Sequence, residues 1–293
     1  MNPGELLLFA VGGLANAAYL FIVAAGLSLV FGSLRVINMA HGSFYMVAAL
    51  VVVVIANRLG SGLGFWTGLL VALAVAGAIG AVVEIVVLKR VYHEEHLVQL
   101  LATYAVSLIV AGAARLVFGA NYRTVAAPVP GSLVLFGYHY SVYSIFMIGA
   151  AIAIGAGVWL MLFRTSLGRN IRAAVSDPEL LNVSGVNVTR LFTLVFVIGA
   201  GLAGLGGVIV APSQAVSTNG MDTDVLVLAF AISVIGGLGS IVGSLVGALI
   251  VGMVSYIGVQ IPATNKFALA FVFIIMAGVL VIRPWGLFGR PEQ

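Results

Sequence analysis

The chain has no cysteine, and only 8% of its 293 residues are charged. Without cysteine it forms no disulfide, thiolate nucleophile or zinc–thiolate site. Soluble domains carry about 25% charged residues, so this composition excludes a water-soluble domain of useful size. A P-loop needs Gly-Lys before Ser or Thr, but the two lysines follow Leu88 and Asn265. The chain therefore does not hydrolyse ATP by that route.

Long uncharged stretches dominate the sequence. Hydrophobic residues make up 62% of the chain, and the stretch 225–265 has no charged side chain. Because about 20 apolar residues cross a bilayer core as a helix, we predict an all-α fold, a polytopic membrane bundle of about eight to nine transmembrane segments forming one domain over 1–293. The expected apolar segments are 6–31, 37–56, 65–88, 97–118, 141–163, 191–211, 225–237, 241–258 and 266–282. Of these, 37–56 and 225–237 are short and could be re-entrant.

The basic residues predict an orientation. The net charge of +4 forms no single stripe that would suit a nucleic acid. Instead, Lys and Arg lie at the ends of apolar runs, the positive-inside pattern. With the 164–190 loop in the cytoplasm, Arg58, Arg123 and Lys266 fall outside, the N-terminus is outside and the C-terminus inside. The basic residues then expected inside are Arg35, Lys89, Arg90, Arg164, Arg169, Arg172, Arg190, Arg283 and Arg290.

Two glycine-containing segments interrupt the apolar pattern. We name residues 32–43 the first break and residues 236–240 the second break. Irregular backbone at membrane depth is tolerated only where it is buried in protein or lines a wet cavity. Asn38 and His41 could therefore line a pathway or tie down freed backbone groups. The candidate pathway or break residues are Asn38, His41, Ser43, Gly236, Gly237 and Gly239.

Small residues recur at every fourth position near the second break and in an earlier segment. Gly199, Ala203 and Gly207 form one series, and Gly239, Gly243 and Gly247 form the other. This spacing places small side chains on one helix face, where neighbouring backbones can approach closely. We predict that these faces pack against other helices of the same chain.

The 164–190 loop is the most structured polar segment. Asp177 suits a helix N-cap and Pro178 the first helical position, while Glu179 would lie in the first turn, where the helix dipole favours negative charge. Gly185 suits the left-handed residue that ends a helix. We predict a helix, a turn and a short second helix outside the bilayer. This pair is either a docking element for a partner or an ordinary structured loop.

Isolated acidic residues give little sign of catalysis. Glu84 lies close to Lys89, which favours an interfacial structural role over a proton site. Asp222 and Asp224 are expected in an outer loop, where they could dock a binding protein or solvate the loop. No carboxylate pair, His/Glu cluster or Ser-His-Asp set has a spacing that supports an enzyme.

Three motifs resemble branched-chain amino acid ABC importer permeases of the LivH type. Gly26–Gly32 and Arg35–Ser43 resemble that family's N-terminal signature, and Val234–Ser240 resembles its later glycine-rich segment. The loop residues Gly168-Arg169, Arg172-Ala173, Asp177 and Gly185-Val186-Asn187 resemble its coupling loop. The resemblance runs from about residue 10 to residue 285.

The resemblance implies a permease domain in the bacterial plasma (inner) membrane, surrounded by lipid and without a cofactor of its own. Its implied partners are a second permease of the LivM type, two cytoplasmic ABC ATPases and a periplasmic or extracellular amino-acid-binding protein. The residues assigned to ATPase coupling are Gly168, Arg169, Arg172, Ala173, Asp177, Pro178, Glu179, Gly185 and Asn187. Arg172 stands where the better-known importer motif Glu-Ala-Ala has glutamate, so this chain departs from that motif and has no carboxylate at this position.

Two alternatives to a branched-chain amino acid importer stay open. One is an ion-coupled secondary transporter or channel acting alone, for which Glu84 is the only candidate coupling carboxylate. The other is an ABC permease for urea or short amides, because specificity would rest mainly with the binding protein.

Overall fold

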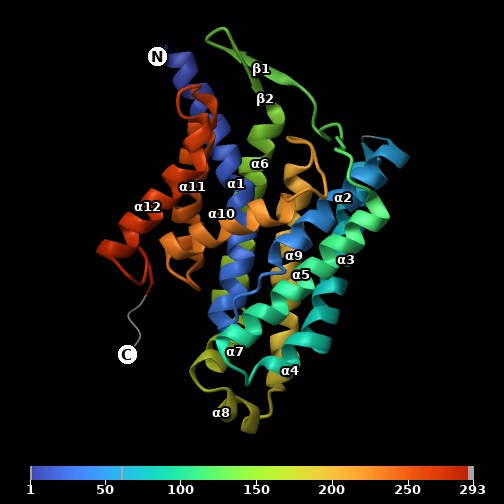
Figure 1. Ribbon diagram of the computed structural model, residues 1–293, viewed down its shortest axis with the longest axis vertical. Helices are drawn as coiled ribbons and strands as arrows, with labels where there is room; N and C mark the ends of the chain where they lie inside the picture. Colours follow the sequence, from blue (N-terminus) through green and yellow to red (C-terminus); the bar gives the residue numbers. More distant parts are fainter. Residues whose placement is uncertain (1, 61, 290–293) are drawn as a thin grey trace.

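The computed structural model describes residues 2–60 and 62–289, and nearly all of its regular structure is helical (Figure 1). The elements in chain order are α1 (Pro3–Leu34), α2 (His41–Leu59), α3 (Leu63–Val83), η1 (Glu84–Leu88), α4 (Lys89–Val91), α5 (His96–Phe118), β1 (Ser132–Leu135), β2 (Tyr138–Ser141), α6 (Val142–Arg164), α7 (Ser166–Ser176), α8 (Pro178–Val183), α9 (Val188–Val210), α10 (Met221–Gly236), α11 (Ile241–Gln260), η2 (Asn265–Phe267) and α12 (Ala268–Ile282). The predicted all-α bundle is confirmed. Arg290, expected on the inner side, lies outside the described residues.

Eight helical runs in the described part of the chain are long and apolar enough to cross a membrane. Two are composite: α3, η1 and α4 form one run, and η2 with α12 forms another. The predicted segment 225–237 corresponds to α10, which begins at Met221 and has 16 residues. At about 1.5 Å per residue, α10 is about 24 Å long and shorter than a bilayer core.

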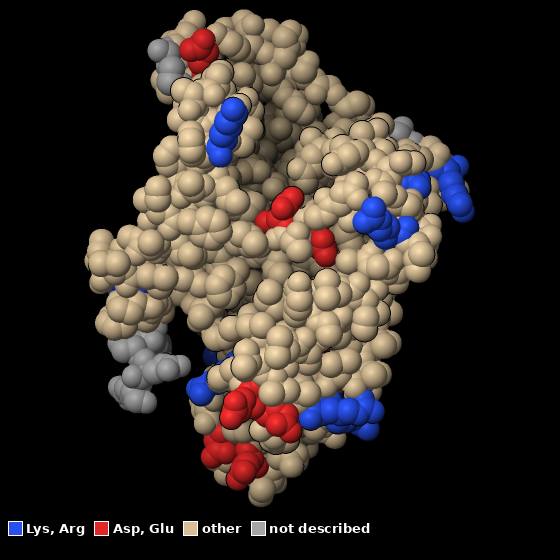
Figure 2. All heavy atoms as spheres, viewed as in Figure 1, with Lys and Arg blue, Asp and Glu red and all other residues tan. Residues whose placement is uncertain are grey.

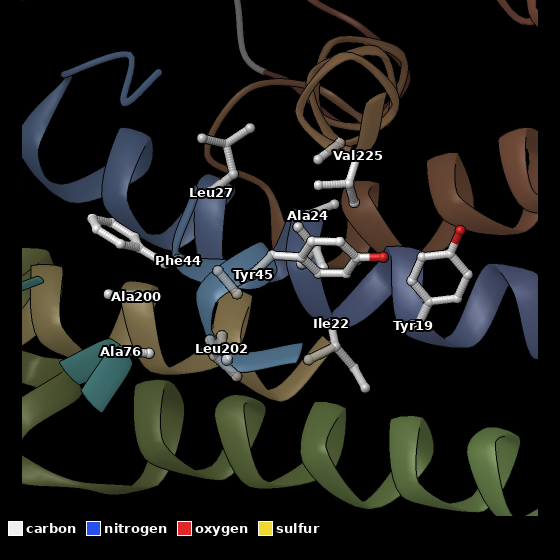
Figure 3. Packing of buried hydrophobic residues seen from close by; sticks show 14 of the residues in the cluster. Tyr19, Ile22, Ala24, Leu27, Phe44, Tyr45, Ala76, Ala200, Leu202 and Val225 are labelled. Carbon is white, nitrogen blue, oxygen red and sulfur yellow. The ribbon is translucent and has the colours of Figure 1, made fainter. Parts of the chain in front are cut away.

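Three helices form the centre of the bundle. α1 contacts α9, α11 and α6, while α2 contacts α3 and α9. Leu20, Ile22 and Phe44 have no exposed surface, and Phe44 meets the Phe196 ring edge-on at 6.1 Å between centroids. Figure 3 shows Phe44 of α2 lying beside Ala200 of α9. Alanine on the facing helix leaves room for these large rings.

The small-residue faces pack inside the chain, as predicted. A Cβ at Gly207 would meet the Tyr45 backbone carbonyl, and a Cβ at Gly247 would meet the Ile232 carbonyl. Gly199 packs against Val30 of α1. Any larger side chain at these positions would push α9 or α11 away from its neighbour.

A β-hairpin that the sequence did not predict closes one end of the bundle, which we call the hairpin end. β1 and β2 pair antiparallel, and the turn residues Phe136 and Gly137 both have positive φ, 54° and 81°. Such turns match the twist of the flanking strands. The Tyr140 hydroxyl donates to the Gly4 carbonyl at 2.9 Å, which fixes the hairpin to the start of α1.

Glu84 lies in η1, a π-helical turn between α3 and α4. The carboxylate is fully buried and accepts hydrogen bonds from Tyr92 Oη at 3.0 Å and Thr193 Oγ1 at 2.7 Å. Burial and the nearby Glu84 charge raise the pKa of Tyr92, so its hydroxyl keeps its proton. Glu84 therefore has a structural role that joins η1 to α9, but it is buried and does not reach the surface beside Lys89.

Candidate functional site

The 164–190 loop folds as the sequence predicts, into two helices at the end of the bundle opposite the hairpin (Figure 1). Asp177 Oδ1 accepts from the Leu180 backbone N–H at 2.9 Å, which caps α8. Gly185 follows α8 with a φ of +88°, a conformation that glycine adopts without strain. Asn187 Oδ1 accepts from the Arg190 N–H at 2.9 Å and caps α9. The loop is therefore held in shape by its own caps.

One face of α7 is built into the membrane bundle. Ile171 and Ala174 are buried, and Gly168 packs so closely on the last turn of α6 that a Cβ would overlap the Leu162 carbonyl. Arg172 donates to that same carbonyl and stacks over the Phe163 ring at 5.4 Å. Arg172 thus fastens α7 to α6.

The other predicted coupling residues point away from the bundle. Arg169, Ala173, Asp177, Pro178, Glu179, Gly185 and Asn187 are all exposed. Sequence reasoning missed two apolar neighbours: Leu180 is 64% exposed and Val183 is 86% exposed. Both lie on α8, which has only six residues, too few to bury an apolar face by itself. The shortness of this predicted helix was the sequence feature that could have indicated the exposure of Leu180 and Val183.

A cavity of about 310 Å³ lies beside α7. Ile171, Arg172 and Val175 form one wall, and Ser28 with Gly32 of α1 forms another. The other walls come from α6, with Trp159, Leu162 and Phe163, and from the second break and the start of α11, with Gly239, Ser240, Ile241 and Val242. The 164–190 loop and the second break therefore border the same space.

The polar side chains of the first break are buried within the protein. Asn38, His41 and Ser43 are each at most 1% exposed. His41 Nε2 lies 2.9 Å from the Val23 carbonyl of α1, and Asn38 Oδ1 accepts from the Ala40 N–H at 3.0 Å. These bonds satisfy backbone groups at a helix interruption and favour the tying role; a pathway role for these residues stays a prediction.

Asp222 and Asp224 do not lie in an outer loop. They occupy the first turn of α10, and the Asp222 carbonyl packs against Gly42 so closely that a Cβ there would overlap it. Asp222 is 8% exposed, and its Oδ2 accepts from Ser43 Oγ at 3.5 Å. The expectation of a solvating loop is wrong for Asp222, because α10 starts inside the bundle.

The second break is closed by backbone. Gly237 and Gly239 have φ values of +102° and +83°, and a Cβ on Gly239 would lie 2.8 Å from Gly32 Cα. The chain after α12 then returns: the Leu287 N–H donates to the Ile235 carbonyl and the Phe288 N–H to the Gly236 carbonyl, both at 2.9 Å. The carbonyls that end α10 are thus paired within the protein, as a break at membrane depth requires.

The family model for branched-chain amino acid transport system permease components matches residues 9–280. The chain belongs to this family. It is 28% identical to the high-affinity branched-chain amino acid transport permease BraD of Pseudomonas aeruginosa, over 96% of this chain and 95% of BraD. It is 30% identical to LivH of Escherichia coli, over 92% of this chain and 91% of LivH.

The chain is also similar to a permease named for a sugar. The chain is 29% identical to the ribose import permease RbsC of Escherichia coli, over 80% of this chain and 70% of RbsC. No solved structure matches the chain. The eight apolar helices found among the described residues, together with the family, make it a multi-pass protein of the bacterial inner membrane. Over residues 2–60 and 62–289, no three His, Asp or Glu side chains gather to hold a metal ion.

Proposed function

We propose that this chain is the permease subunit of an ATP-driven importer and forms half of a pathway for branched-chain or other hydrophobic amino acids. The observation that carries the proposal is the 164–190 loop, a capped helix pair with one face fixed to the bundle and the other exposed. Family membership supports the substrate class. The power source is a separate pair of cytoplasmic ATPases, and a second permease completes the pathway.

The exposed face of the loop is the proposed ATPase contact. Leu180 and Val183 supply apolar surface, and Asp177 with Glu179 supplies charge around it. Solvent-exposed apolar side chains on a projecting helix are typical of a docking element. A solute-binding protein would deliver the amino acid at the hairpin end, since the loop defines the cytoplasmic end.

Movement of the loop reaches the second break through α7. Gly168 and Arg172 fix α7 to α6, and the buried Ile171 faces the cavity bordered by Gly239 and Ser240. When the ATPases close, we expect α7 to change the shape of this cavity and to shift the inner end of α10. The central path then opens to alternate sides.

Crosslinking tests the loop contact. The chain has no native cysteine, so Ser176→Cys or Asn182→Cys provides a single thiol on an exposed residue. We expect an adduct with an ATPase subunit in the assembled complex, and none from a control cysteine at His139 on the hairpin. Absence of any adduct from both loop positions in an intact complex contradicts the coupling role.

Uptake measurements separate this proposal from an ion-coupled transporter. The rival's candidate from the sequence, Glu84, already accepts hydrogen bonds from Tyr92 and Thr193. Asp222, buried in the first turn of α10, is a second carboxylate that the rival could use. In proteoliposomes we expect leucine uptake only with both permeases, ATPases, binding protein and ATP present. Uptake by the purified chain driven by a proton or sodium gradient would favour the rival. If urea or ribose competes with leucine uptake in the complete system, the proposed substrate class is wrong but the importer function stands.

A further inference from the structure

The N-terminal end of α10 lies deep inside the bundle. His41 binds the Val23 carbonyl, and Val23 is eleven residues before Leu34, the last residue of α1. At 1.5 Å per residue this contact is about 16 Å from the end of α1. The adjacent Gly42 packs on the Asp222 carbonyl, which places Asp222 at a similar depth. Figure 1 shows α10 crossing the middle of the bundle.

Two carboxylates therefore lie near mid-height. Asp222 is 8% exposed and its contact with Ser43 Oγ is 3.5 Å long, the upper limit for a hydrogen bond. Asp224 is exposed, and the next residue, Val225, belongs to the same buried cluster as Tyr19 and Tyr45. Figure 2 shows acidic side chains beside a hollow at the height where α10 begins. The helix dipole stabilises such carboxylates, but they remain costly at membrane depth without a cation.

A tyrosine pair provides an independent sign of a ligand. Tyr19 and Tyr45 are stacked with centroids 6.4 Å apart, and Tyr45 Oη accepts from Gln214 Nε2 at 3.2 Å. Tyr19 is 9% exposed; its hydroxyl pairs with no residue within 2–60 and 62–289 and is not among the enclosed polar atoms, so a small ligand can reach it. Figure 3 shows the Tyr45 hydroxyl directed toward Tyr19, and the Tyr19 hydroxyl directed toward the side of α1 on which Val225 of α10 lies.

We propose that Asp222, Asp224, Tyr19 and Tyr45 form a docking site for the ammonium group of the transported amino acid. This inference rests on the proposed importer function and names the substrate group that its pathway recognises. A primary ammonium has three N–H donors, which match carboxylate oxygens and the free Tyr19 hydroxyl. Tyrosine faces also attract a cation. Because the apolar side chain is not needed for this contact, the site accepts aliphatic amino acids of different sizes.

Direct binding tests the site without the ATPases. The probe is leucinamide, which keeps the ammonium group of leucine and lacks the carboxylate. The comparison compound is 4-methylpentanoate, which keeps the carboxylate and lacks the ammonium group. Both are titrated by calorimetry, to millimolar concentration, into the full chain in lipid nanodiscs. We expect leucinamide to bind to the wild type and 4-methylpentanoate not to bind. The double variant Asp222→Asn/Asp224→Asn should weaken leucinamide binding about tenfold or more, because charge-assisted hydrogen bonds are lost.

The control variant Glu94→Gln/Glu95→Gln removes two negative charges from exposed positions after α4, away from the proposed site (Figure 1). We expect unchanged affinity. Three results would each overturn the proposal. Leucinamide does not bind to the wild type, it binds to the Asp222→Asn/Asp224→Asn variant with the same affinity as to the wild type, or sodium ions displace it as well as another ammonium ligand does. Uptake in the complete transporter is measured separately. If the wild-type complex takes up no amino acid with ATP, the proposed importer function is rejected. The titration of leucinamide still reports separately on the ammonium site.

Discussion

The two ends of α10 are built differently. At its N-terminal end, a side-chain contact accompanies one close backbone contact: Ser43 Oγ donates to Asp222 Oδ2 at 3.5 Å, and the Asp222 carbonyl packs on Gly42. At its C-terminal end, backbone meets backbone, with Gly239 on Gly32 and Leu287 pairing with Ile235. The first end presents polar groups that a substrate can use. The second end leaves no space for a side chain and borders the 164–190 loop, so it is suited to transmitting movement.

The largest effect is expected at the glycine end. A Cβ on Gly236 would overlap the Gly243 carbonyl, so Gly236→Val should destabilise the protein by about 2–4 kcal/mol through overpacking. The measurement is the unfolding midpoint in detergent. Gly278→Ala is the control, because a Cβ there meets nothing within 4 Å. Equal stability of the two variants would contradict the close backbone contact.

The next largest effect on stability is expected for His41 at the first break. It distinguishes a structural role, in which His41 bonds a free backbone group, from a role in lining the pathway. His41→Ala removes the bond to the Val23 carbonyl and leaves a cavity in a fully buried site. We expect a loss of about 1–3 kcal/mol in unfolding free energy. If His41 instead lines the pathway, the variant would keep its stability and lose uptake alone. Its matched control is the exposed His139→Ala.

A smaller effect on stability, but a strong effect on assembly, is expected at α8. Val183 is 86% exposed, so Val183→Glu should change the stability of the isolated chain by about 0.5 kcal/mol or less. We expect it to lower ATPase binding and uptake about tenfold, because a charge enters an apolar contact. Val183→Thr, of similar shape, should retain most activity. Normal pull-down of the ATPase by the Glu variant would remove Val183 from the contact.

The smallest effect is expected at Ser43. Ser43→Ala loses only contacts of 3.5 Å, so we expect a change of about 0.5 kcal/mol or less in stability. Ser28→Ala sharpens the comparison, because Ser28 Oγ is 2.6 Å from Ser244 Oγ in a buried cluster that holds α1 to α11. A larger loss for Ser43 than for Ser28 would show that the N-terminal end of α10 is held more firmly than its contacts indicate.

The features predicted from sequence are those that depend on nearby residues. Asp177, Pro178 and Gly185 each act within one helical turn, and the expected caps of the 164–190 loop are present. The position of both breaks and the packing of the small-residue faces also followed from local spacing. In contrast, the depth of Asp222 depends on Gly42, far away in the chain, and the tail at Leu287 pairs with Ile235 only after α12 has returned. The roles of the predicted site residues in coupling or in a pathway stay predictions.

Labelling of Ser176→Cys in intact cells tests the central claim. The claim is that the 164–190 loop lies in the cytoplasm, where the ATPases move it. The reagent is a membrane-impermeant maleimide, with His139→Cys on the hairpin as the opposite-side control. We expect the His139 variant to be labelled in intact cells, and the Ser176 variant to be labelled only in inside-out vesicles stripped of ATPase. Labelling of Ser176→Cys in intact cells would contradict the account.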